Sequence, residues 1–242
     1  VFHFSEKPDG PNLLNHHDRG RFIQQSFYGR PDGSMWVDKP WCWNPVQGGD
    51  YKGKPARVIE SREQPDLLYV KSIPRNWAGG EELGECVMEQ WVSLKGPVAT
   101  IRHRFSYRGE VKHPPRHQEL PAVFVDAKLA DLVYYSGEKP WTGGKLSEDR
   151  PGWPNEGRDA TEEWAAWTGP DGRGIGVHFP GRRKLTTYRY KGKPGPAGSG
   201  CSYFAPIETM TIEPGFRHES VTHLTIGTPA EIRGRFEPLR DK

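Results

Sequence analysis

The chain has 242 residues, of which 34% are hydrophobic and 12% aromatic, with nine tryptophans and a formal net charge of +3. The aromatic content argues against a disordered chain, and the 29 glycines and 23 prolines follow no repeat, which excludes a collagen-like helix. The net charge is only mildly positive and the sequence has no run of five basic residues, so we expect no nucleic-acid partner. No apolar stretch approaches the length of a membrane-spanning helix, so we expect no membrane partner either.

Eleven segments have the β-branched, aromatic or alternating composition of strands, and clusters of Gly, Pro, Asp or Asn separate nearly all of them. In chain order they are 21–28, 67–73, 86–94, 98–107, 118–125, 131–135, 162–168, 174–179, 185–190, 202–212 and 219–226. The dipeptides Lys95-Gly96 and Asp171-Gly172 are typical of hairpin turns.

One helix is well signalled, close to the C-terminus. Thr228 is a favoured N-cap, Pro229 suits the first helical position, Glu231 completes a capping box, and Pro238 ends the helix. Strands and helices do not alternate, which argues against a parallel α/β fold. The sequence therefore predicts an all-β fold: a two-sheet antiparallel β-sandwich, a jelly roll or a mutarotase-like supersandwich, with one short C-terminal helix. We expect residues 1–242 to form a single domain.

Two long segments, 32–55 and 139–161, lack strand character and are rich in Gly, Pro and Trp. Long loops in compact domains are usually functional or disordered. Tryptophan is rare in disordered segments. We therefore expect both segments to form the walls of a groove.

The run Arg116-His117-Gln118-Glu119 lies where a Pro-rich turn becomes a strand. Alternate residues of a strand share a face, so His117 and Glu119 are expected on one side, and Arg116 and Gln118 on the other. A base, an acid and a cation placed together suit bond-cleaving chemistry. The alternative is a solvated strand entry that contains two ion pairs.

Two further regions contain candidate sugar-binding residues. On the strand 21–28, Gln24 and Tyr28 share one face, while Arg21 and Gln25 share the other, and a polar row suits sugar hydroxyls. In the loop 41–50, two tryptophans with Asn and Asp suit stacking on a pyranose ring with hydrogen bonds at its rim. A solvent-facing strand and a loop that plugs the sandwich are the alternatives. With two residues of a further strand, the candidate binding set is Arg21, Gln24, Gln25, Trp43, Asn44, Asp50, Glu89 and Trp91.

Metal and cofactor signals are weak. His117 and Glu119 are separated by one residue, but no His-x-His or His-x3-His spacing occurs, so we predict no catalytic metal. No phosphate loop or dinucleotide fingerprint occurs, so no organic cofactor is expected, while a structural Ca²⁺ is left open. Cys42, Cys86 and Cys201 fit one disulfide plus a free thiol as well as they fit three buried thiols.

The polar and aromatic strand faces, the Trp-bearing loops and the chain length resemble those of β-sandwich carbohydrate-active proteins. The resemblance extends to jelly-roll polysaccharide lyases and to mutarotase-like sandwiches, without a diagnostic motif of either family. Jelly-roll lyases use a Gln, His, Tyr and Arg set. The resemblance implies that His117, Tyr28 and Arg116 or Arg21, with Gln24 or Gln25, take these places here.

Four functions follow from these residues. The first is a lyase that cleaves a uronate polysaccharide by β-elimination. Arg116 or Arg21, with a Gln, neutralises the carboxylate, and His117 is the base because an imidazole titrates near neutral pH. Tyr28 is the acid, or acts as both acid and base. The second is a glycoside hydrolase that pairs Glu119 with a second carboxylate, for which the candidates are Asp50, Glu89 and Glu163. A non-catalytic carbohydrate-binding protein and a mutarotase-like epimerase are the others. We expect a secreted or periplasmic bacterial protein that acts as a monomer.

Overall fold

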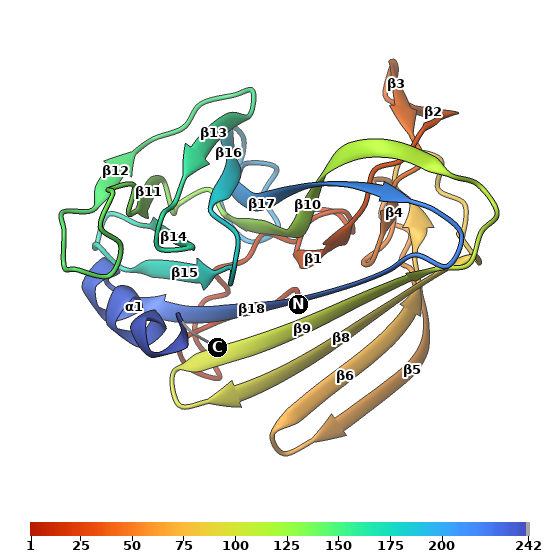
Figure 1. The fold of residues 1–242 in the computed structure, drawn as a ribbon. Coiled ribbons are helices and arrows are strands. Elements are labelled where there is room, and N and C mark those ends of the chain that lie inside the picture. The colour runs from red at the N-terminus through yellow and green to blue at the C-terminus, as the bar shows by residue number, and fades with distance from the viewer. Residues whose placement is uncertain (241–242) are drawn as a thin grey trace.

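The structure is a computed structural model, and it describes residues 1–240. Two large antiparallel sheets make up the molecule (Figure 1). The seven-stranded sheet has the order β13 (Glu156–Asp159), β16 (Lys184–Tyr190), β17 (Cys201–Ile212), β10 (His113–Asp126), β1 (Ile23–Ser26), β4 (Pro45–Val46) and β7 (Arg75–Asn76). The nine-stranded sheet has the order β12 (Ser147–Asp149), β11 (Asp131–Tyr134), β14 (Trp164–Thr168), β15 (Gly174–His178), β18 (Arg217–Gly227), β9 (Val98–Tyr107), β8 (Cys86–Lys95), β6 (Leu67–Ile73) and β5 (Arg57–Gln64).

The main core lies between these two sheets. Ile23, Val123 and Phe204 of the seven-stranded sheet are fully buried, as are Ile101 and Trp167 of the nine-stranded sheet, and all five belong to one apolar cluster. Because successive strand residues point to opposite faces, the residues next to these core positions are directed to the other side of the seven-stranded sheet. That outer face carries its own aromatic cluster, formed by Ala122, Phe124, Tyr188, Tyr203 and Ala205.

The predicted all-β sandwich and its helix are confirmed. The strands β6 and β9 have the predicted bounds, and both predicted hairpin turns join neighbouring antiparallel strands. The helix α1 (Pro229–Phe236) begins with the expected capping box, in which Thr228 accepts a hydrogen bond from Glu231 N and Thr228 N donates to Glu231. Pro238 lies in the 3-10 turn Glu237–Leu239 that follows the helix. No helix in the described part of the chain is long and apolar enough to cross a membrane.

The sequence missed several short strands and one long one. The segments 32–55 and 139–161, predicted as loops, include a two-stranded hairpin formed by β2 (Pro31–Trp36) and β3 (Lys39–Cys42), and also β12 and β13. The edge strand β5 is exposed along nearly its whole length, and only Val58 and Ile59 are apolar. It has no buried face to impose an alternating pattern, and alternation is the signal by which strands are predicted.

The three cysteines are all free and buried in this structure. Burial raises the pKa of the thiols of Cys42, Cys86 and Cys201, so these side chains stay protonated near neutral pH. Of the two alternatives left by the sequence, the structure contains the three buried thiols.

The buried histidine His178 is expected to make the fold sensitive to acid. His178, at the end of β15, is fully buried, and its ring stacks against the rings of His223 and Phe236, with centroid distances of 5.7 and 5.5 Å. Burial, with a smaller effect from His223, lowers the pKa of His178 to about 4. In the unfolded chain His178 binds a proton near the ordinary histidine pKa of 6.5, whereas in the folded protein it does so only near pH 4. The folded state therefore loses stability as the pH falls from 6.5 to about 4.

We expect His178→Phe to remove part of this acid sensitivity, because phenylalanine preserves the ring stack and does not titrate. Between pH 7 and pH 4 the native protein should lose on the order of 3 kcal/mol more unfolding free energy than the variant, from about 1.4 kcal/mol per unit of pKa difference. Urea unfolding at several pH values measures this difference. His3→Gln, at an exposed position, is the matched control, and parallel curves for His178→Phe and the native chain would contradict the argument.

Candidate functional site

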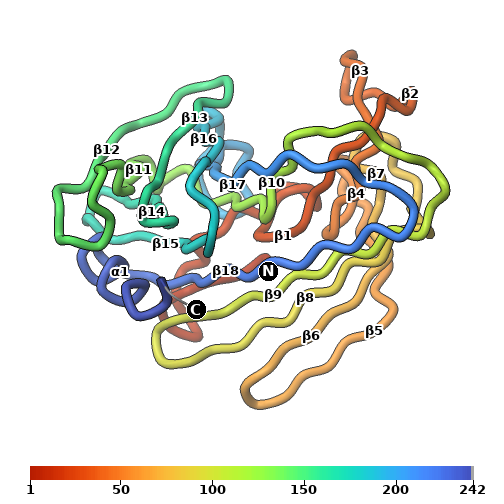
Figure 2. The backbone as a smooth tube through the Cα atoms, in the orientation of Figure 1, coloured from red at the N-terminus to blue at the C-terminus, as the bar shows by residue number. Residues whose placement is uncertain are grey.

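The outer face of the seven-stranded sheet is the floor of a groove with a volume of about 1140 Å³. Figure 1 shows the β2–β3 hairpin and the β13–β16 region projecting on the same side of this sheet, with β10 and β1 between them, and the tube in Figure 2 follows the same course. The groove is lined from the floor by Ser26, Tyr28, Arg116, His117, Glu119, Tyr188, Tyr203 and Thr209, and from its margins by Asp18, Arg21, Trp36, Trp41, Trp77 and Trp153.

Glu119 lies on β10 in the centre of the floor. It is paired with Ser26 of β1 on one side and with Ile207 of β17 on the other. The phenols of Tyr28 and Tyr203 both donate hydrogen bonds to Glu119 Oε2, over 3.2 and 2.6 Å. The strands β10 and β17 and the segment that follows β1 therefore hold one carboxyl group and two phenols in contact.

The environment of this cluster favours the protonated form of each of its three groups. Burial raises the pKa of Glu119, and the two hydrogen bonds from the phenols oppose only part of that rise. Burial and the charge of Glu119 raise the pKa of Tyr28 and of Tyr203 well above the ordinary value. The ring of Tyr188 stacks on that of Tyr203, with a centroid distance of 4.5 Å. The phenols stay protonated near neutral pH, and so suit proton donation rather than proton removal.

His117 precedes Glu119 by two residues, and both line the groove, as the alternation of the strand predicts. The imidazole is exposed, and its Nδ1 is 2.7 Å from Thr209 Oγ1 on β17. Its Nε2 makes no hydrogen bond with any residue from 1 to 240. The ring is thus oriented by one nitrogen, while the other is open to a ligand.

The remaining two residues of the run differ from the prediction in one respect. Gln118 is buried on the opposite side, as expected, and clamps the backbone of Tyr28 by accepting from its N and donating to its O. Arg116, expected beside Gln118, lines the groove instead. The pairing of β10 with β17 is irregular between His113 and Arg116 and regular from Arg116 to Glu119, so Arg116 lies at the boundary of the regular pairing. Arg116 forms no salt bridge with the described residues.

A second carboxyl group lines the groove at its margin. Asp18 is 3.3 Å from Arg21 Nε, and Arg21 also donates to Asn15 Oδ1 and to Ser199 O. Burial raises the pKa of Asp18 more strongly than Arg21 lowers it. Sequence reasoning selected Arg21 and missed Asp18. The dense polar run 15–21 was the available signal.

The two glutamines of β1 are structural. Gln24 is buried, donates to Arg19 O and Arg21 O, and accepts from Gly48 N, so its amide is used within the protein. Gln25 points between the sheets and donates to Glu89 O. Neither amide lines the groove, and the amide nitrogens of both donate hydrogen bonds to backbone oxygens.

Some residues of the loop 41–50 are buried within the fold, and others line the groove. Trp43 is buried and stacks on His113 at 3.9 Å, and Asp50 is buried and accepts from Lys54 N. Asn44 reaches the groove, but its amide donates to Ser26 Oγ and Phe27 O. Trp41, not included in the predicted binding set, lines the groove.

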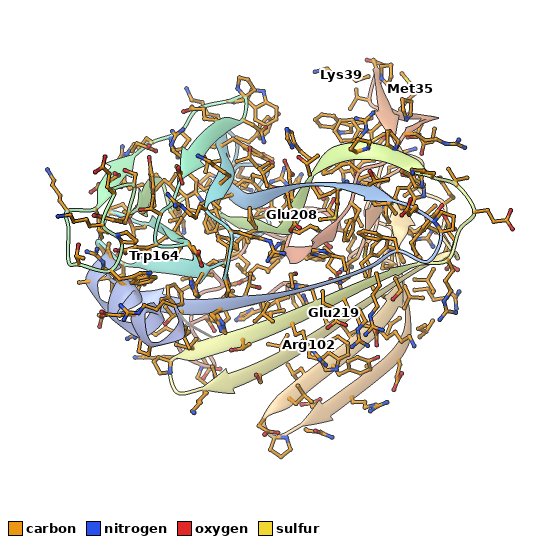
Figure 3. All side chains as sticks on the ribbon, viewed as in Figure 1. Met35, Lys39, Arg102, Trp164, Glu208 and Glu219 are labelled. Atoms are coloured by element: carbon orange, nitrogen blue, oxygen red, sulfur yellow. The ribbon has the colours of Figure 1, made fainter. Side chains whose placement is uncertain are left out.

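Glu89 and Trp91 lie on β8 of the nine-stranded sheet and do not line the groove. Glu89 accepts a hydrogen bond from Tyr69 over 2.7 Å, and the guanidinium of Arg102 lies 3.9 Å from the Trp91 ring centroid. Figure 3 labels Arg102 on that second sheet. The sequence could not show that β8 belongs to the other sheet, because strand order is a tertiary property.

Among residues 1–240 no group of three or more His, Cys, Asp or Glu side chains is arranged to hold a metal ion. His117 and Glu119, the pair considered from sequence, have Thr209 and two tyrosines as their hydrogen-bond partners.

No family model and no curated protein matches the chain. Among solved structures, it is similar to a galactose mutarotase-like protein from Lactobacillus casei, with 10% identity, 90% of each chain covered and a TM-score of 0.50. The sandwich is of the mutarotase-like type. It is also similar to a TPR-domain containing protein from Parabacteroides distasonis, with 12% identity and a TM-score of 0.53, over 94% of this chain and 43% of that one. At these identities the likeness shows the fold alone.

We expect Tyr203→Phe to raise the pKa of Glu119 further, because it removes a hydrogen bond that stabilises the carboxylate. Tyr28→Phe should produce a smaller rise, since its bond to Glu119 is longer. Titration of ¹³C-labelled glutamate side chains, with Glu119→Gln to assign the signal, measures both shifts. An unchanged Glu119 pKa in Tyr203→Phe would show that the bond does not persist in solution.

Proposed function

We propose that this protein is a polysaccharide lyase that cleaves a uronate-containing chain by β-elimination in the groove. One observation carries the proposal: Arg116, which forms no salt bridge with residues 1–240, lines the same groove as His117 and the Tyr28–Glu119 pair. β-Elimination needs a cation for the uronate carboxylate, a base for the C5 proton and an acid for the leaving oxygen. The groove offers a group of each kind.

Arg116 is suited to the first task. A guanidinium binds a carboxylate through two parallel hydrogen bonds, and it stays charged at all working pH values. The other arginine of this region, Arg21, is already paired with Asp18. Neutralising the substrate carboxylate makes the C5 proton more acidic, which is the change that elimination requires.

The proton transfers are then assigned to the floor residues. His117 Nε2 takes the C5 proton, and the C–H electron pair forms the C4–C5 double bond as the C4–O bond breaks. Tyr28 gives its proton to the leaving oxygen, and a proton from solvent is returned to Tyr28 through Glu119, whose carboxyl group is in hydrogen-bond contact with this phenol. Burial and the charge of Glu119 raise the pKa of Tyr28, which keeps this phenol protonated near neutral pH and argues against a tyrosinate base.

Incubation with alginate, pectate, glucuronan and glycosaminoglycans should therefore generate the ultraviolet absorbance of an unsaturated uronate. His117→Ala should lower the elimination rate by ~10²–10⁴-fold, the usual contribution of an acid–base group. Near-native activity of His117→Ala would remove this residue from the mechanism.

Arg116→Gln tests the substrate class. We expect a large loss of activity on uronate polymers with retained folding, because Arg116 forms no salt bridge within the described chain. Arg102→Gln is the matched control, since it removes an arginine from the nine-stranded sheet, outside the groove. Equal activities of the two variants would contradict the role of Arg116.

A glycoside hydrolase is the second candidate, and it is favoured by a separate observation. Asp18 and Glu119 both line the groove, and burial raises the pKa of both. Two carboxyl groups at a sugar site are what most glycosidases use. The partners considered from sequence, Asp50, Glu89 and Glu163, do not line the groove.

The same incubations separate the two functions. New reducing ends without unsaturated product, abolished by Glu119→Gln and by Asp18→Asn, would establish hydrolysis and overturn the lyase proposal. Binding of a glycan without any cleavage would leave a carbohydrate-binding protein.

A further inference from the structure

The groove extends across the strands on both sides of Glu119. β10 is the fourth of the seven strands; β16 is two strands away on one side, and β7 is three strands away on the other. At a strand spacing of about 4.8 Å, the floor continues for roughly 10 Å in one direction and 14 Å in the other. Each of these distances accommodates at least one pyranose ring beyond the central residues.

The first side, here called the β16 arm, consists of Trp153, Tyr188 and Tyr190. The Trp153 ring stands edge-on to Tyr188 and Tyr190, with centroid distances of 4.9 and 5.5 Å. Trp153 is 54% exposed and Tyr190 is 45% exposed, although both are large aromatic residues. All three line the groove, so this arm presents accessible ring surface to a ligand.

The second side, here called the hairpin arm, consists of Trp36, Trp41 and Trp77. Their ring centroids lie 5.2 to 5.4 Å apart, and Trp41 Nε1 donates to Asn44 Oδ1, which fixes that ring. Two of the three come from the β2–β3 hairpin, whose tip carries the labelled Met35 and Lys39 in Figure 3. Trp41 also approaches Tyr28 at 6.5 Å, which joins this arm to the central cluster.

We propose that the two arms bind successive sugar residues of one glycan chain on both sides of Glu119, so that cleavage falls inside the chain. The position of cleavage rests on the proposed function, whereas the two-sided binding does not. Aromatic rings stack on the apolar faces of sugars while the hydroxyl groups bond at the rim. An enzyme that removes only terminal units needs a barrier on one side of its catalytic groups, and here both sides carry aromatic rings.

Binding is measured with His117→Ala, so that the chain stays intact, using size-defined uronate oligosaccharides and calorimetry. Affinity should rise with chain length until both arms are filled. Trp153→Ala and Trp41→Ala, each added to His117→Ala, should each weaken binding of the longest oligosaccharide about 2- to 10-fold, the usual value of an aromatic contact. Trp91→Ala, which removes a tryptophan from the nine-stranded sheet, is the matched control, with thermal unfolding to verify folding of every variant.

The products of the native protein test where cleavage falls. Internal cleavage should lower the viscosity of the polymer early and release a ladder of intermediate sizes. Release of only the smallest sugars from the start would overturn the proposal even if elimination is observed. The proposal would also be overturned if only one of Trp153→Ala and Trp41→Ala weakened binding. Two-sided binding without any unsaturated product would instead leave the arms in place and contradict the lyase.

Discussion

The alternation of side chains in the seven-stranded sheet is the constraint on which the rest of the structure depends. One face of this sheet must cover the nine-stranded sheet, and Val123 and Phe204 are buried there for that reason. Their neighbours Phe124 and Tyr203 are therefore directed to the opposite face, where no second sheet covers them. The groove lies on the uncovered face of the seven-stranded sheet, and the other face of this sheet packs in the core.

This arrangement explains how a carboxyl group is kept in an unfavourable place. Glu119 is half-buried, and desolvation of its charged form raises its pKa. The hydrogen bonds from Tyr28 and Tyr203 offset part of that cost; Tyr203 is held by β17, and the backbone of Tyr28 is held by the side chain of Gln118. The pKa of Glu119 thus depends both on its burial and on the backbone positions that bring the two phenols to its carboxyl group.

Local signals predicted the parts of the molecule that local interactions decide. The strands 67–73 and 98–107, and the capping box of Thr228 and Glu231, follow from alternation and from hydrogen bonds within a few residues. The shared side of His117 and Glu119 follows from the same alternation. Strand β5 was missed because no face of it is buried, so selection for a core leaves no pattern in its sequence.

The sequence by itself determined the strand-rich composition, the antiparallel sandwich and the placement of the His117 imidazole and the Glu119 carboxyl group on one strand face. Tertiary structure decided which polar residues are available to a ligand: Gln24 and Gln25 are used by backbone groups, and Glu89 belongs to the other sheet. It also brought Asp18, Trp41 and Trp153 to the same groove as Glu119. The physical reason is that strand order and long-range hydrogen bonds join residues far apart in the chain, and a periodic pattern reports only which face of its own strand a residue occupies.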